Sequence, residues 1–163
     1  MIRKLTPEAR AAFREAEVEA RREGSRSVEA EHVLLALSNT EGTDANAVLL
    51  SAGLDRDAIR RALARDFRTS LTAAGVSIDI PEGTSASVRP ANRLRMGQSA
   101  KLVWQRAIKA AAKRSDKQLG TTHLLLGVLQ APVGTVPRAL NEAGVARSEL
   151  TARAEEALAA NGR

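Results

Sequence analysis

The sequence predicts an all-α fold of two tandem four-helix repeats related by a pseudo-twofold axis. Of its 163 residues, 44% are apolar but only 2% are aromatic. Ala, Leu, Val and Ile must therefore form the core, and Ala- and Leu-rich sequence favours helix. Apolar residues recur at three- and four-residue spacing, which is typical of amphipathic helices. A shift of 91 residues, the separation of His32 and His123, overlays residues 5–67 on 96–158 without a gap.

The positions that match under this shift are mostly apolar or turn residues, as a duplicated fold requires. AEHVLLAL at 30–37 falls on TTHLLLGV at 121–128, and Phe13 falls on Trp104. We therefore expect one compact domain with three segments: repeat 1 at residues 1–67, a linker at 68–95 and repeat 2 at 96–163.

The first two helices of repeat 1 are marked by their ends. Thr6 is a hydroxyl N-cap, and it is followed by Pro7 and Glu8, which both suit the first turn of a helix. Gly24 ends this helix. A second, short helix is expected at about 31–37, and a polar loop follows it.

The third and fourth helices of repeat 1 are separated by a glycine turn. The third stops at Gly53, because a left-handed conformation after a helix favours glycine. Asp55 then caps the fourth helix. Its buried side is expected to carry Ile59, Leu63 and Phe67.

Repeat 2 follows the same plan, with helices at about 98–113, 122–130, 136–143 and 146–159, and with Gly144 in the role of Gly53. The linker is rich in Ser, Thr, Gly and Pro. Within it Val76, Ile78 and Ile80 alternate with polar residues, which indicates either a small β-hairpin or an irregular loop.

Several classes of function have no sequence support. The chain has no Cys, no phosphate-binding glycine loop, no pair of metal-spaced histidines and no nucleophile elbow. We expect His32 and His123 to be structural residues that bond the backbone, and we expect no cofactor, no metal and no catalysis. With no long apolar run and no signal-peptide pattern, a cytoplasmic location without membrane contact is predicted.

The net charge of +6 has two interpretations. It can serve solubility, or it can attract an acidic partner, so that a helical nucleic-acid-binding or regulatory protein is the alternative function. Scattered arginines and few aromatic residues make nucleic acid the less favoured partner.

The motifs together resemble a known family. Thr6-Pro7-Glu8-Ala9 opens the first helix, and Gly24 to Leu37 follows the pattern G-x-x-x-[VI]-x-[TA]-E-H-[VIL]-L-L-[GA]-L. Both features resemble the N-terminal domain of the Clp unfoldases, ClpA and especially ClpC. The resemblance implies a module that binds substrates and adaptors ahead of an AAA+ ring serving the ClpP peptidase.

No ATPase sequence follows in this chain, so we expect a stand-alone Clp-N-like protein. Its expected partners are Clp ATPase or protease components, substrate proteins and adaptors. It would act either by delivering substrates or as a decoy for the machine's own N-terminal domain.

The resemblance also implies a ligand. ClpC N-terminal domains read phosphorylated arginine, with a glutamate for the guanidinium and a threonine near the phosphate. The matching positions are Thr6 and Glu31 in repeat 1, but Gly97 and Thr122 in repeat 2. We therefore expect at most one phosphoarginine site, in repeat 1, and a degenerate equivalent in repeat 2. The alternative for Glu31 is an acid that simply stabilises the start of a helix.

Cyclic peptide antibiotics form a second class of ligand of ClpC domains, which bind them through phenylalanines near the start of each repeat. The positions here are Ile2 or Leu5, and Met96. None is aromatic, so this binding is disfavoured.

Overall fold

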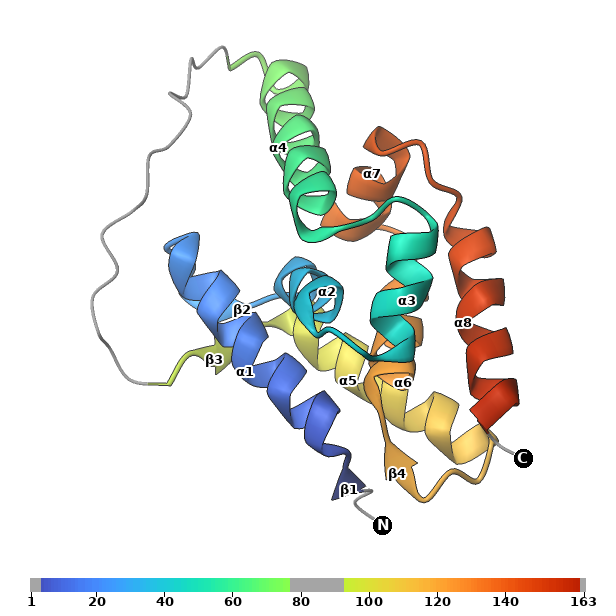
Figure 1. Cartoon of the computed structure of the whole chain (residues 1–163). Helices are drawn as coiled ribbons and strands as arrows, with labels where there is room; N and C mark the ends of the chain where they lie inside the picture. Colours follow the sequence, from blue (N-terminus) through green and yellow to red (C-terminus); the bar gives the residue numbers. More distant parts are fainter. Residues whose placement is uncertain (1–3, 77–92, 162–163) are drawn as a thin grey trace.

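The computed structural model describes residues 4–76 and 93–161, which form eight helices and four two-residue strands (Figure 1). The all-α class and the two repeats are confirmed. Repeat 1 contains α1 Pro7–Arg22, α2 Ala30–Asn39, α3 Asp44–Ser51 and α4 Arg56–Ala73. Repeat 2 contains α5 Gln98–Lys113, α6 Thr121–Leu129, α7 Thr135–Glu142 and α8 Arg147–Asn161.

The expected end signals act as predicted. The Thr6 hydroxyl accepts a hydrogen bond of 3.1 Å from the backbone N–H of Ala9. Asp55 caps α4 in the same way, through the N–H of Ala58 at 2.7 Å. Gly53 and Gly144 follow α3 and α7 with φ of 73° and 70°, so the glycine turns are confirmed.

Two short parallel bridges join the repeats. Strand β1 Lys4–Leu5 pairs with β4 Gln118–Leu119, and β2 Ser27–Val28 pairs with β3 Arg95–Met96. The 91-residue shift converts one bridge into the other, which is the pattern of a twofold axis. The sequence does not predict these strands, because two residues are too few to display an alternating pattern.

The helices are also exchanged between repeats. The fourth helix of each repeat packs on the third helix of the other: α4 on α7, and α8 on α3. The two short helices α2 and α6 lie in contact at the centre (Figure 1). Every residue of α6 is buried, as are most residues of α2, so the duplicated phrase forms the core of the molecule.

Phe13 and Trp104 meet on the pseudo-twofold axis. Their ring centroids lie 5.5 Å apart, with the planes at 67°, in an edge-to-face arrangement. Because the two residues occupy equivalent positions in the repeats, a direct contact between them places both beside the axis.

The structure of α4 differs from expectation in the exposure of one side chain and in the length of the helix. Phe67, expected on the buried side, is 52% exposed, whereas Ile59 is buried. The helix also continues to Ala73, within the segment expected to be linker. The C-terminal end of α4 reaches away from the other helices (Figure 1). Most of the expected hairpin lies outside the described residues.

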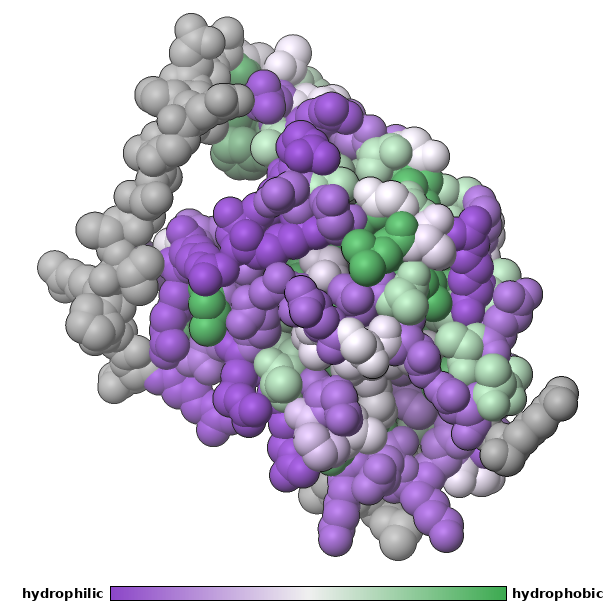
Figure 2. Space-filling view, viewed as in Figure 1, coloured by the Kyte–Doolittle hydropathy of each residue, from purple (hydrophilic) through white to green (hydrophobic). Residues whose placement is uncertain are grey.

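A fully buried carboxylate ties α1 to α4. Glu19 accepts hydrogen bonds from Arg56 Nε at 2.8 Å and from Arg60 at 2.6 Å, and Arg22 adds a third at 3.1 Å. Burial alone would raise the pKa of Glu19, but the bonds and charges of Arg60 and Arg56 outweigh burial and hold it below its ordinary value. The surface over α1 is mostly hydrophilic (Figure 2). Within the described ranges no helix is long and apolar enough to span a membrane.

Candidate functional site

The two histidines of the duplicated phrase are structural, as predicted. His32 Nδ1 accepts the backbone N–H of Glu29 at 2.9 Å, and His123 Nδ1 accepts that of Gly120 at 3.1 Å. In each ring Nε2 faces a carboxylate at 2.9 Å, from Glu23 and Asp116 respectively. Because Nδ1 accepts in both rings, Nε2 is the donor. Each histidine therefore fixes the start of its helix and the loop before it.

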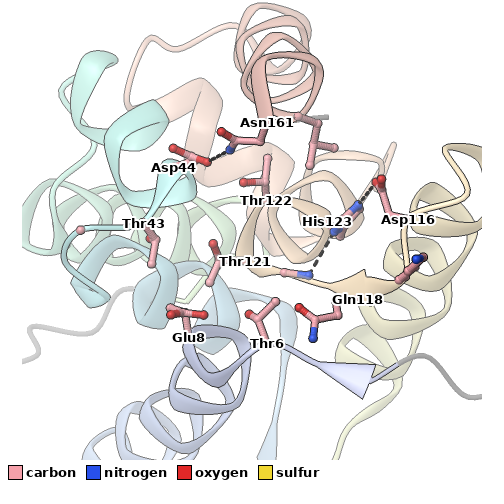
Figure 3. Close-up of a pocket in the computed structure, with 14 residues that line it drawn as sticks. Thr6, Glu8, Thr43, Asp44, Asp116, Gln118, Thr121, Thr122, His123 and Asn161 are labelled. Atoms are coloured by element: carbon pink, nitrogen blue, oxygen red, sulfur yellow. Dashed lines mark hydrogen bonds and ion pairs between the residues drawn. The ribbon is translucent and has the colours of Figure 1, made fainter. Parts of the chain in front are cut away.

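A polar cavity of about 680 Å³ opens at the start of α6 and is called the α6 pocket here (Figure 3). The N-termini of α1, α3 and α6 all border it, through Thr6, Thr43 and Thr121. Gly120 precedes α6 and offers no side chain to cap it. Free N–H groups at a helix start attract acceptors and anions.

Two threonine hydroxyls at the start of α6 line the α6 pocket without a hydrogen-bond partner among the described residues. Thr121 is 6% exposed and Thr122 is 5% exposed, and neither hydroxyl makes a hydrogen bond within the described chain. Three carboxylates also line the pocket: Glu8, Asp44 and Asp116. Asp44 contacts Asn161, and Asp116 contacts His123 (Figure 3). The pocket therefore presents both donors and acceptors.

A second cavity of about 500 Å³ lies at the start of α2 and is called the α2 pocket. It is the counterpart of the α6 pocket, because lining positions correspond under the 91-residue shift. The pairs are Glu31 and Thr122, Phe67 and Leu158, Ser70 and Asn161, and Thr135 and Asp44. The duplicated fold thus carries a duplicated pocket with different chemistry in each copy.

Glu31 gives the α2 pocket its character. Its half-buried carboxylate has no ion pair within the described residues, and burial raises its pKa, as do the nearby charges of Glu23 and Glu29. Arg60 and Arg138 line the same pocket, and Arg60 Nε is buried without a hydrogen-bond partner. Arg138 Nε donates to Asp66 at 2.9 Å.

The structure does not bring Thr6 and Glu31 into one pocket. The β1–β4 bridge sets the start of α1 beside the start of α6, so Thr6 lines the α6 pocket together with Thr122. The same exchange places the start of α5, after Gly97, beside the start of α2, where Ser99 Oγ accepts the N–H of Ala30 at 2.9 Å. The expected pairing of Thr6 with Glu31 assumed that repeat 1 builds its own pocket, whereas each pocket combines residues of both repeats.

Gly97 is explained by a carboxylate that takes its space. A Cβ at this position would lie 1.7 Å from Oε1 of Glu29. The Glu29 carboxylate accepts the backbone N–H of Ser99 at 3.2 Å and also contacts its hydroxyl, so it caps α5 from outside. Burial would raise the pKa of Glu29, but the bonds from Ser99 and Ser27 outweigh it and lower the pKa. The role of Glu29 could not be predicted from the sequence, because its partner Ser99 is 70 residues away along the chain.

A third cavity, of about 470 Å³, lies on the pseudo-twofold axis and is called the axis pocket. Leu5 and Met96, the positions expected for cyclic peptides, both line it, while Ile2 lies outside the described residues. Phe13 and Trp104 supply aromatic surface here instead. In the sequence, the equivalence of these two residues under the shift was the signal that the rings occupy matching places. Within the described residues no cluster suits a metal ion.

The fold and its paired pockets define a tandem-repeat helical domain. Comparison of the chain with known protein families and solved structures identifies the family. The family model described as the Clp repeat (R) N-terminal domain matches residues 4–95 and 95–161. The chain therefore belongs to this family, as the resemblance implied. A search of curated protein sequences gives no match.

Solved structures with the same fold include Clp N-terminal domains. The N-terminal domain of the caseinolytic protease associated chaperone ClpD from Arabidopsis thaliana is 21% identical, with a TM-score of 0.70, over 96% of this chain and 95% of that one. The Hsp104 N-terminal domain from Candida albicans is 18% identical, with a TM-score of 0.67, over 94% and 90%. A third neighbour, from a malarial protein secretion system, is 15% identical, with a TM-score of 0.66, over 94% and 93%.

Proposed function

We propose that this chain is a non-catalytic protein-binding module of Clp-dependent proteolysis, which binds substrates or adaptors or competes for them as a decoy. Membership of the Clp repeat N-terminal domain family carries this proposal, since Clp N-terminal domains are interaction modules of Clp chaperones. The paired helix-start pockets, with threonine hydroxyls in one and the Glu31 carboxylate in the other, are the surfaces on which such recognition would act.

The test is retention of Clp components from the native cytosol on the immobilised chain. Enrichment of Clp ATPase subunits, their adaptors or their substrates, relative to an unrelated basic helical protein, is the expected result. Equal retention on both resins would contradict the proposal. The control has a matching positive charge because the +6 charge of this chain attracts acidic proteins without specificity.

The finer proposal is that the α2 pocket holds one phosphorylated arginine. Glu31 supplies an unpaired carboxylate for the guanidinium, and a bidentate pair of this kind is among the stronger charge-assisted contacts. The exposed Phe67 ring in the same pocket suits a stacked guanidinium. Arg60 and Arg138 line the same pocket, and the N–H groups that they do not donate to Glu19 and Asp66 are the donors proposed for the phosphate. Thr6 has no part in this site, because it lines the other pocket and caps α1.

Calorimetry with free phosphoarginine tests this assignment. One site per chain is expected, and Glu31→Ala should abolish binding. Thr122→Val is the matched control at the equivalent position in the α6 pocket, and it should leave the affinity unchanged. Two equal sites, or an affinity that survives Glu31→Ala, would exclude the α2 pocket as the reader.

A further inference from the structure

The axis pocket combines an apolar floor with a strongly basic rim. Its floor comes from the bridging strands, through Leu5 of β1, Val28 of β2 and Met96 of β3, and from the edge-to-face pair of Phe13 and Trp104. These groups belong to both repeats. Their joint contribution makes this a site of the whole domain, independent of the two helix-start pockets.

Three arginines line the rim: Arg10 and Arg14 on α1, and Arg93 just before β3. All three are exposed, and none has an ion-pair or hydrogen-bond partner among the described residues. The one acid lining the pocket, Glu17, is already engaged, with Arg21 at 2.6 Å and with the backbone N–H of Leu94 at 3.0 Å. Among the described residues, therefore, no free acid lies at the rim to balance its three positive charges.

We propose that the axis pocket docks an acidic peptide segment that inserts one large apolar side chain into the floor. A carboxylate-bearing segment matches the three arginines, and charge complementarity of this kind guides association and fixes orientation. The floor supplies the buried apolar contact that gives an interface most of its affinity.

A polyanion without apolar side chains matches the rim but leaves the floor empty. Single-stranded nucleic acid binds by stacking bases on presented ring faces. Here Phe13 and Trp104 are partly buried and packed edge to face on one another. The geometry therefore favours a peptide over nucleic acid as the occupant.

The single tryptophan makes the pocket its own reporter, because Trp104 is the only Trp and the chain has no Tyr. The probe is the peptide EEDFDEE, which adds no tryptophan emission, titrated at about 0.15 M salt. A saturable change in Trp104 emission is expected. The peptide EEDADEE should bind about tenfold more weakly, because it lacks the apolar anchor.

Charge-reversal variants locate the rim. Arg10→Glu/Arg14→Glu should weaken EEDFDEE binding about tenfold or more. The matched control, Arg61→Glu/Arg65→Glu, reverses two exposed arginines on α4 that do not line the pocket, and it should change affinity less than about twofold. Arg93→Glu, outside any helix, gives a second rim variant whose effect does not depend on the stability of α1.

Three outcomes would overturn the proposal. One is equal binding of the Phe and Ala peptides, which would reduce the interaction to charge alone. Another is tighter binding of a 12-nucleotide single-stranded DNA than of EEDFDEE under the same conditions, with a steep salt dependence. The third is an unchanged peptide affinity in both rim variants.

Discussion

Glu31 is a half-buried carboxylate that has no ion-pair partner among the residues that the structure describes. Burial raises its pKa above the ordinary value of 4.5, so the folded state binds this proton more tightly than the unfolded state does. Through this group, folding becomes less favourable as pH rises from the ordinary pKa to the raised one. A residue that costs stability at neutral pH fits a role in binding.

Glu31→Gln should therefore raise the free energy of unfolding at pH 7, and its advantage over the natural chain should disappear below pH 4.5, where both side chains are uncharged. Urea unfolding at several pH values measures the difference. Glu155→Gln, an exposed change on α8, is the control and should stay within about 0.5 kcal/mol of the natural chain. A Glu31→Gln chain less stable at pH 7 would mean that the carboxylate has a partner in solution.

Glu19 presents the opposite case, because its folded-state pKa is lowered. Its contribution to stability is present above the ordinary pKa of 4.5 and is lost as pH falls through the lowered folded value. Glu19→Gln should cost about 3 kcal/mol at pH 7, near the lower end for breaking a buried ion pair, because its arginines can still reach water. Chemical unfolding at pH 7 and in acid should show the cost shrinking in acid. A cost that did not change with pH would point to packing instead of charge.

The helix starts could be predicted from the sequence, but the residues that share a pocket could not. Thr6, Gly53 and Gly144 act through neighbours a few residues away, so local rules predicted them correctly. Glu29 caps α5 and Glu19 binds two arginines of α4, and both depend on contacts across tens of residues. Such pairs have no periodic signature, and the Glu19 equivalent in repeat 2 is alanine, Ala110.

At the scale of elements, the closest approach of two helices is set by Gly127. A Cβ there would lie 2.4 Å from the carbonyl oxygen of Val103 in α5 and 3.2 Å from the backbone N of Ala107. These are backbone atoms of a packed helix, so α5 and α6 would have to separate to admit a methyl group. The equivalent position in α2 is Ala36, which is fully buried.

Gly127→Ala should destabilise the chain by about 2 kcal/mol, even though alanine is the better helix former, because overpacking a tight contact outweighs the gain in propensity. Thermal unfolding followed by circular dichroism measures the effect. Ala36→Gly is the matched change and should cost about 1–2 kcal/mol, from the lower helix propensity of glycine and the loss of a buried methyl group. An increase in melting temperature for Gly127→Ala would show that the two helices are free to adjust.

At the scale of the whole molecule, the repeats are duplicated in sequence but interleaved in space. Each bridge takes one strand from each repeat, and α4 and α8 each pack on the third helix of the other repeat. Each helix-start pocket is likewise a joint product, which is why Thr6 meets Thr122 and not Glu31. The two pockets therefore carry different side chains, hydroxyls in the α6 pocket and a carboxylate in the α2 pocket, around one shared core.

This interleaving predicts that neither repeat folds alone. In a fragment of residues 93–163, α6 loses its contacts with α1, α2 and α3, β4 loses β1, and α7 loses α4. Apolar positions buried in the whole chain, such as Leu124 and Leu125, then face water. A single core of this size rarely supplies more than about 3–5 kcal/mol even when complete. Circular dichroism should show low helicity and no cooperative melt for this fragment, whereas the whole chain should melt in one transition. Mixing it with residues 1–76 should restore both helicity and cooperativity, and a fragment that melts cooperatively by itself would mean that each repeat closes its own core.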